Sequence, residues 1–193
     1  MDRRTFLATG LAGAGFATAG CSGLLGNTVP LTVEETEPED EGREKYLICR
    51  HDGQRILAVG FDQRTVQRSP TDDFGFRITN SHDDTKIESF TVDLRAPQTS
   101  VDPPADIYLK APSGGLWPDL TYEEVENLWT RIELDDTGEL GEGTLNLETL
   151  VDPTSVPVTE VGIRVEMELS STESRRTYTI DTATEFEPVV EQS

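Results

Sequence analysis

The sequence predicts an all-β domain in which two sheets pack as a sandwich. The clearest evidence is residues 161–169, where five apolar residues alternate with glycine and charged residues. Such alternation places the apolar residues of a strand on one face. A second observation is Asp52-Gly53 between two apolar runs. This pair is typical of a β-hairpin, because a type I′ turn needs positive φ at both central residues. Strands with one apolar face must bury it, and a second sheet provides the partner.

Further strands follow the same alternation along the chain. The expected strands are 46–50, 55–59, 74–78, 90–95, 107–109, 145–147, 161–169 and 178–180, the last continuing toward Phe186. About eight or nine such strands favour an immunoglobulin-like arrangement, with a small closed β-barrel as the alternative. An all-parallel sheet is excluded, because its strands are apolar on both faces.

One segment departs from the alternation. Thr121 and Glu124 have the spacing of a capping box, with Thr121 as the N-cap of a helix. Val125, Leu128 and Trp129 then fall at positions i, i+3 and i+4, which is the spacing of one helical face. One short helix is therefore expected here, followed by another strand.

The chain is strongly acidic. Lys and Arg number 16 and Asp and Glu 37, so the formal net charge is 16 − 37 = −21. A surface of this sign repels nucleic acid, so we exclude nucleic-acid binding. Only three basic residues are lysine. Many carboxylates with few lysines resemble the composition of halophilic proteins, in which molar salt shortens the Debye length to ~3 Å and screens the repulsion. An acidic protein without this adaptation is the alternative.

The N-terminus resembles a twin-arginine export signal. Arg3 and Arg4 are followed by one residue and then by the apolar pair Phe6 and Leu7. The segment that follows is uncharged, rich in Gly and Ala, and only mildly apolar. Weak hydrophobicity of this kind suits an export signal better than a membrane-spanning helix, which needs about 20 strongly apolar residues.

The residues that follow this segment resemble a lipobox. In Thr18-Ala19-Gly20-Cys21, small residues precede a cysteine, although Thr18 stands where such motifs prefer Leu, Val or Ile. Together, residues 1–21 resemble the start of a haloarchaeal twin-arginine-exported lipoprotein. The resemblance implies that Cys21 carries a lipid through a thioether and holds the domain on the extracellular face of the cell membrane. An uncleaved apolar anchor is the alternative.

These observations divide the chain into four parts. Residues 1–20 are expected to be the signal peptide, 21–43 the lipidated N-terminus with a disordered acidic spacer, 44–187 the sandwich, and 188–193 a flexible tail. The spacer is expected because its carboxylates repel one another and extend the chain. If Cys21 carries a lipid, Cys49 has no partner and the domain contains no disulfide.

No catalytic residue, metal site or cofactor is expected. Cys49 lies in the first strand of the domain, whereas copper sites of small β-sandwiches gather Cys, His and Met on a late loop. We therefore expect Cys49 to be a small buried residue. His51 and His82 are isolated from any recognisable nucleophile motif. The acidic turns lack the spacing of a calcium-binding loop.

The loop that carries Leu116 and Trp117 is the candidate binding site. Large apolar side chains on a glycine-rich loop suit a protein or carbohydrate partner, or else they fold back over the end of the core. The sequence thus favours a lipid-anchored, non-catalytic binding or interaction module at the cell surface. A structural envelope lipoprotein and a secreted hydrolase with an unrecognised site are the alternatives.

The acidic composition leads to the first prediction. The midpoint temperature of unfolding should rise steeply from dilute buffer to molar KCl, because salt screens the repulsion among carboxylates. Thermal unfolding followed by circular dichroism over a KCl series measures this, and a flat dependence would contradict the halophilic interpretation.

Overall fold

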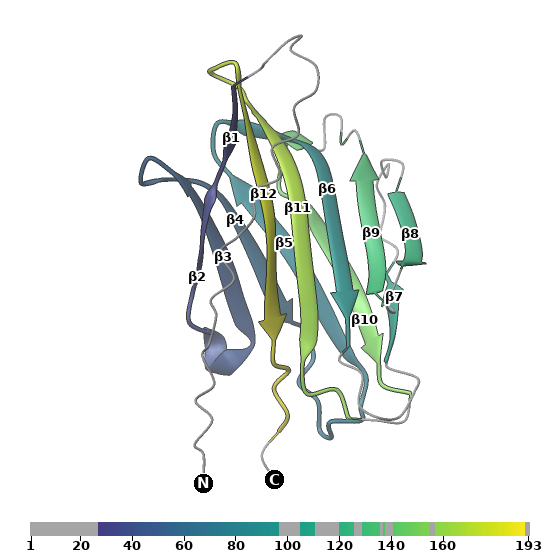
Figure 1. The fold of residues 1–193 in the computed structure, drawn as a ribbon. Coiled ribbons are helices and arrows are strands. Elements are labelled where there is room, and N and C mark those ends of the chain that lie inside the picture. Colours follow the sequence, from purple (N-terminus) through teal and green to yellow (C-terminus); the bar gives the residue numbers. More distant parts are fainter. Residues whose placement is uncertain are drawn as a thin grey trace, which may run out of the picture.

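The protein is an all-β two-sheet sandwich, as the sequence predicts, and each sheet has six strands, so the two sheets together hold more strands than the eight or nine expected (Figure 1). The computed structural model describes residues 27–96, 105–110, 120–125, 129–135, 137, 141–154 and 157–191. The sheets are separate and face each other, so the arrangement is a sandwich and not a closed barrel (Figure 1). The first 26 residues, with Arg3, Arg4, Phe6, Leu7 and Cys21, lie outside the described residues.

Each sheet takes strands from both halves of the chain. Sheet A has the order β1 (Asn27–Pro30), β12 (Arg176–Phe186), β11 (Val161–Ser171), β6 (Thr85–Arg95), β9 (Trp129–Asp135) and β8 (Leu120–Val125). Sheet B has the order β2 (Thr32–Glu35), β3 (Glu44–His51), β4 (Gln54–Gln63), β5 (Phe74–His82), β10 (Asn146–Asp152) and β7 (Asp106–Leu109). A short 3-10 turn, η1 (Asp40–Gly42), follows β2. The pairing of β1 with β12 is parallel, whereas the other strand pairs are antiparallel.

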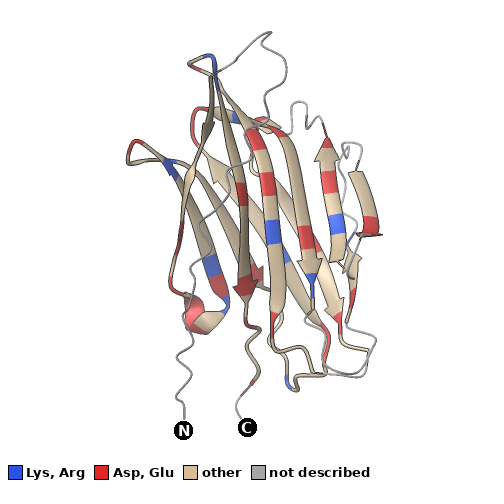
Figure 2. Ribbon diagram, viewed as in Figure 1, with Lys and Arg blue, Asp and Glu red and all other residues tan. Residues whose placement is uncertain are grey.

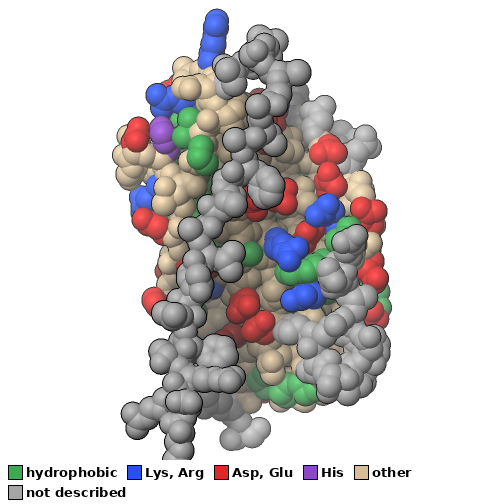
Figure 3. All heavy atoms as spheres, viewed as in Figure 1, with side chains coloured by type: hydrophobic (Ala, Val, Ile, Leu, Met, Phe, Trp, Pro, Cys, Tyr) green, Lys and Arg blue, Asp and Glu red, His purple; other side chains and the backbone are tan. Residues whose placement is uncertain are grey.

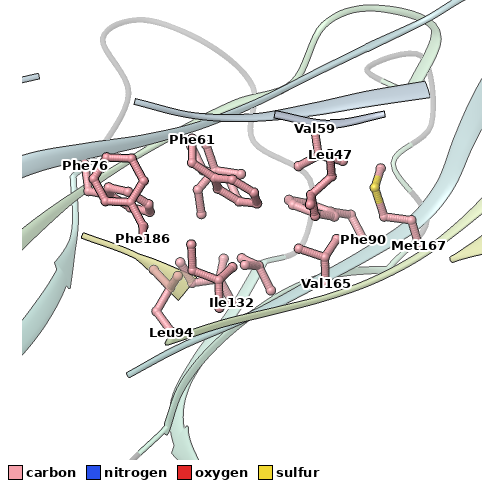
Figure 4. Packing of buried hydrophobic residues seen from close by; sticks show 14 of the residues in the cluster. Leu47, Val59, Phe61, Phe76, Phe90, Leu94, Ile132, Val165, Met167 and Phe186 are labelled. Carbon is pink, nitrogen blue, oxygen red and sulfur yellow. The ribbon is translucent and has the colours of Figure 1, made fainter. Parts of the chain in front are cut away.

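The apolar faces of the two sheets form the core (Figure 4). The five apolar residues of 161–169 are all at most 4% exposed, which confirms the predicted alternation of β11. Aromatic rings join the sheets, because Phe76 of sheet B lies 5.1 Å, between ring centroids, from Phe186 of sheet A. Phe61, which also belongs to sheet B, stacks on Phe76 with 6.2 Å between the ring centroids. Burial of these faces is the main source of stability.

The predicted hairpin turn is present between β3 and β4. Asp52 has φ of 50° and Gly53 has φ of 80°, so both central residues are in the left-handed region. Because glycine adopts this region without steric cost, the Asp-Gly pair fixes the register of the two strands.

The predicted helix at 121–129 is wrong. Leu120–Val125 is strand β8, and it pairs antiparallel with β9, with Thr121 opposite Glu133 and Val125 opposite Trp129. The capping-box pattern and the helical spacing are local signals. The hydrogen bonds that β8 makes with β9 at the edge of sheet A outweigh them, as tertiary context often does.

The predicted start of the domain at residue 44 is also wrong. Residues that were expected to be spacer form β1 and β2, and the buried Leu31 lies between these strands. The carboxylates of Glu34 and Glu35 do not force this segment into an extended spacer, because they form ion pairs with basic residues of β3. Glu34 pairs with Arg50, and Glu35 pairs with Lys45. The folded region also extends past residue 187.

The end of the folded region is fixed by contacts with the β4–β5 loop. The backbone of Val190 forms a bridge with that of Gln67, and the Gln63 side-chain amide donates a hydrogen bond of 3.0 Å to the Val189 carbonyl. The expected flexible tail therefore begins later than residue 188. No helix among the described residues is long and apolar enough to span a membrane.

The alternation of β11 gives a contrasting pair of substitutions. Ile163→Asp should lower the free energy of unfolding by several kcal/mol, because it buries an unpaired carboxylate. The whole free energy of unfolding of a typical domain is about 5–15 kcal/mol. Glu166→Gln should change stability by less than about 0.5 kcal/mol, because Glu166 is exposed. Urea unfolding measures both, and equal effects would mean that β11 is not half-buried.

Candidate functional site

The predicted site residues lie outside the described part of the chain. Leu116 and Trp117 belong to the connection between β7 and β8, and neither they nor Cys21 are among the described residues. Their roles in ligand binding and lipidation stay predictions.

Cys49 is buried in the core, as expected. Its exposed fraction is 0%, and burial raises the pKa of the thiol to about 11. Because the thiolate is the reactive and metal-binding form, Cys49 is inert near neutral pH.

The two histidines are the last residues of different strands, β3 and β5. His51 Nε2 lies 3.3 Å from Asp52 Oδ2, whereas His82 Nε2 lies 3.1 Å from the carbonyl oxygen of Gly143. These contacts do not bring either histidine next to a buried serine or cysteine that could act as a nucleophile. No group of three or more His, Cys, Asp and Glu side chains among the described residues is arranged to hold a metal ion.

A tryptophan lies flat on the outer face of sheet A. In β9, Ile132 and Leu134 point into the core, so Trp129 and Arg131 belong to the outer face. The Trp129 ring extends across β6 to β11, where a Cβ on Gly162 would lie 3.2 Å from ring carbon Cη2. The missing side chain at Gly162 therefore makes room for the ring.

Two arginines cover this tryptophan. The guanidinium carbon of Arg164 lies 4.1 Å from the Trp129 ring centroid, and that of Arg95 lies 4.6 Å away. With both in place, Trp129 is only 6% exposed. Each such cation–π contact contributes about 0.5–2 kcal/mol, depending on how far it is desolvated. We call Arg95, Trp129 and Arg164 the arginine–tryptophan cluster.

The two arginines of the cluster form no ion pair with a carboxylate of the described residues, although Glu35, Glu160 and Glu185 line the same hollow. Within the described residues, neither Arg95 nor Arg164 forms an ion pair within 4 Å. In addition, Arg95 Nε is buried and has no hydrogen-bond partner among the residues that the structure describes. A buried donor without a partner costs free energy of folding, so such donors are rare in proteins. The arrangement is also unusual because carboxylates are abundant in this chain, whose net charge is −21.

The neighbouring arginine shows the ordinary arrangement. Arg131 Nε and Nη2 donate to the two carboxylate oxygens of Asp93 at 2.8 and 2.9 Å. These hydrogen bonds raise the pKa of Arg131 above its usual value. Arg131 is therefore neutralised by its own sheet, in contrast to Arg95 and Arg164.

A hollow of about 440 Å³ adjoins the cluster and reaches the edge of sheet B. There Lys45 Nζ donates to Thr184 Oγ1 at 2.7 Å and forms an ion pair of 2.8 Å with Glu35. The hydrogen bond from Lys45 lowers the pKa of Glu35. Figure 3 shows basic side chains gathered around hydrophobic atoms on this face. Acidic residues are spread along the strands and turns of the ribbon (Figure 2).

A second hollow, of about 550 Å³, lies on the outer face of sheet B. Tyr108, which is 48% exposed, forms part of its wall. On its rim, Lys110 Nζ pairs with Glu148 at 2.7 Å, and this hydrogen bond lowers the pKa of Glu148. The charges around this hollow are thus paired internally.

Sequence reasoning missed the arginine–tryptophan cluster because it placed Trp129 on a helix. One signal was present in Gly162, the only non-charged outer residue within 161–169. A glycine inside a strand often marks the close approach of another group, which here is the Trp129 ring.

Comparison with known proteins gives a family. The family model described as Domain of unknown function (DUF8121) matches residues 29–190. The match begins in β1 and ends after β12, so it includes the segment that joins the two sheets at the start of the fold. No curated protein matches the sequence.

Several solved β-domains are similar in shape. The seventh ScaB type I cohesin from Pseudobacteroides cellulosolvens is 10% identical, with 68% of this chain and 92% of that chain covered and a TM-score of 0.39. The human F-spondin reeler domain is 11% identical, with 74% and 93% covered and a TM-score of 0.38. The bacterial hydrophobin BslA is 9% identical, with 69% and 93% covered and a TM-score of 0.35. Because these scores are below 0.5, they carry nothing about what the chain binds.

The packing of the cluster predicts the effect of filling Gly162. Gly162→Val should destabilise the domain by about 1–3 kcal/mol, because the new side chain displaces the Trp129 ring. Strand propensity alone predicts the opposite sign, since glycine weakens a strand. Urea unfolding together with the indole NMR signal of Trp129 measures both effects.

Glu166→Val is the matched control on the same strand and face. It should leave the Trp129 signal in place and change stability by no more than about 0.5 kcal/mol. A stabilising Gly162→Val with an unchanged Trp129 signal would contradict the position of the ring.

Proposed function

We propose that this chain, which belongs to the family described as Domain of unknown function (DUF8121), is a lipid-anchored, non-catalytic binding module on the outer face of the cell membrane. The fold supports a binding role, because a rigid sandwich presents broad outer faces. The buried thiol of Cys49 and the separate strand ends of His51 and His82 do not support a catalytic role.

The observation that carries the proposal is the pair of guanidinium groups in the arginine–tryptophan cluster, neither of which forms an ion pair with a described carboxylate. Stacking on Trp129 restricts Arg95 and Arg164, so less conformational entropy is lost when these side chains bind a partner. Guanidinium groups bind carboxylates and sulfates through pairs of parallel hydrogen bonds. The cluster therefore suits a protein or carbohydrate partner that carries such groups.

The anchoring part of the proposal is supported by the order of motifs at the N-terminus. Arg3-Arg4, the pair Phe6-Leu7 and Cys21 follow one another as in a twin-arginine signal with a lipobox. A two-chain lipid on Cys21 would hold the protein stably, because each buried CH₂ contributes ~0.8 kcal/mol. The acidic surface is in keeping with an environment of high salt, in which repulsion among carboxylates is screened.

Replacement of the lipidated cysteine tests the anchor. Cys21→Ser should shift the protein from the membrane pellet to the soluble fraction, or stall its processing, because the lipid has no attachment atom. Fractionation and immunoblotting measure the distribution. Arg3→Lys combined with Arg4→Lys should instead retain the protein inside the cell. Wild-type behaviour of the Cys21→Ser protein would refute lipidation at this residue.

Removal of the cluster's charge tests the binding role. The double variant Arg95→Gln/Arg164→Gln should lose the partner that the tethered wild-type protein retains in a pull-down from solubilised membranes. Arg50→Gln/Lys110→Gln is the matched control, because it removes the same charge from sheet B. Recovery of the same partner by both double variants would show that the cluster does not bind it.

A further inference from the structure

We infer that the domain rests with one end against the membrane: the end formed by the β3–β4, β5–β6 and β11–β12 hairpin turns. We call this the turn end and define it as residues 50–55, 83–86 and 172–176. The inference rests on the proposed lipid at Cys21. It adds an orientation, because it states which surface meets the lipid headgroups and which surface stays free.

The tether is short, because the segment expected to be a spacer is folded. Strand β1 begins at Asn27, so five residues separate it from Cys21. Six residue steps span at most ~20 Å when the chain is fully extended. The start of β1 must therefore remain within about that distance of the lipid.

The start of β1 lies at the turn end. Asn27 pairs with Arg176, the first residue of β12, and β1 then runs parallel to β12. Strand β12 contains eleven residues. At ~3.3 Å per residue, its other end lies more than ~30 Å away. The tether is shorter than this length, so it holds the turn end nearest to the membrane.

Side-chain and backbone contacts join the three turns into one surface. Arg176 Nη1 lies 3.3 Å from His51 Nε2, which links the β11–β12 and β3–β4 turns. Arg55 Nη2 donates to Asp83 Oδ2 at 3.1 Å, which links the β3–β4 and β5–β6 turns. The Thr172 amide donates to the Asp84 carbonyl at 2.9 Å, which closes the set.

The turn end also carries less net negative charge than the chain as a whole. Its charged residues are five basic and four acidic, namely Arg50, Arg55, Lys86, Arg175, Arg176, Asp52, Asp83, Asp84 and Glu173. Glu34 and Glu88, which form ion pairs with Arg50 and Lys86 at 3.0 and 3.4 Å, belong to the same surface, so the sum is 5 − 6 = −1, against −21 for the whole chain. Asp135, at the end of β9, lies on the side of sheet A away from β1. Anionic headgroups therefore repel this surface less than they would repel a surface with the average charge of the chain.

The orientation places the arginine–tryptophan cluster away from the membrane. Arg95 pairs with Gly162, and Gly162 pairs with Glu185 near the far end of β12. Glu185 is nine residues from Arg176, or ~30 Å along the strand. The cluster is thus exposed to partners outside the cell surface.

A chemically made tether tests the orientation. Cys21 and Cys49 are the two cysteines of the full chain, and Cys49 is buried, so a maleimide lipid attaches to Cys21 of the folded protein. The tethered protein is placed on nanodiscs of phosphatidylcholine and phosphatidylglycerol that contain a gadolinium-chelate lipid. NMR then measures the paramagnetic broadening of each amide signal.

Amides of the turn end, such as those of Gly53 and Ser174, should broaden strongly. Amides of the far end, such as those of Val158 and Glu187, should broaden at least about tenfold less, because ~30 Å of strand separates the ends. Equal broadening at both ends, or stronger broadening at the far end, would overturn the inference.

A lengthened tether is the control. A Gly/Ser insertion of about 20 residues between Gly26 and Asn27 adds an r.m.s. span of ~25 Å and should remove most of the difference. If the two ends of this variant still differ in broadening as much as in the protein with the short tether, tether length does not set the orientation. Because the tether is made chemically, failure here leaves the anchoring proposal intact, whereas the Cys21→Ser fractionation tests that proposal separately.

Discussion

The mutual burial of two apolar sheet faces is the constraint on which the rest of the structure depends. Each strand must turn its apolar residues inward, so the alternate residues are committed to the outer faces. Among the described residues the only cysteine is the free Cys49, so packing takes the place of cross-links. The outward residues then meet in rows that cross the sheet. Trp129, Arg95 and Gly162 lie in one such row, and this is how residues remote in sequence form a single cluster.

The features that sequence predicted are those that local patterns determine. Residues 161–169 alternate without interruption, and all five apolar members are buried. Asp52-Gly53 forms its turn because backbone conformation at these two residues depends mainly on their own side chains. The all-β class and the two-sheet sandwich follow from the number of such strands. These statements need no knowledge of which strands are neighbours.

The features that sequence missed depend on neighbours. Thr121 and Glu124 have a helical spacing, but pairing with β9 outweighs it. Glu34 and Glu35 suggest an extended spacer until Arg50 and Lys45 are known to lie beside them on β3. The arginine–tryptophan cluster needs the register of three strands. The same correction shortens the tether, and so a revised boundary changes the expected position of the whole domain relative to the membrane.

Sheet register brings Trp129 onto Gly162 and places Arg95 and Arg164 over its ring. Nuclear Overhauser effects between the Trp129 indole and the Gly162 α-protons test this arrangement most directly, because they appear only when the two groups are in contact. The structure predicts strong effects, together with upfield shifts of the Gly162 α-protons from the ring current. Absence of these effects, or helical contacts between Val125 and Trp129, would contradict both the register and the site built on it.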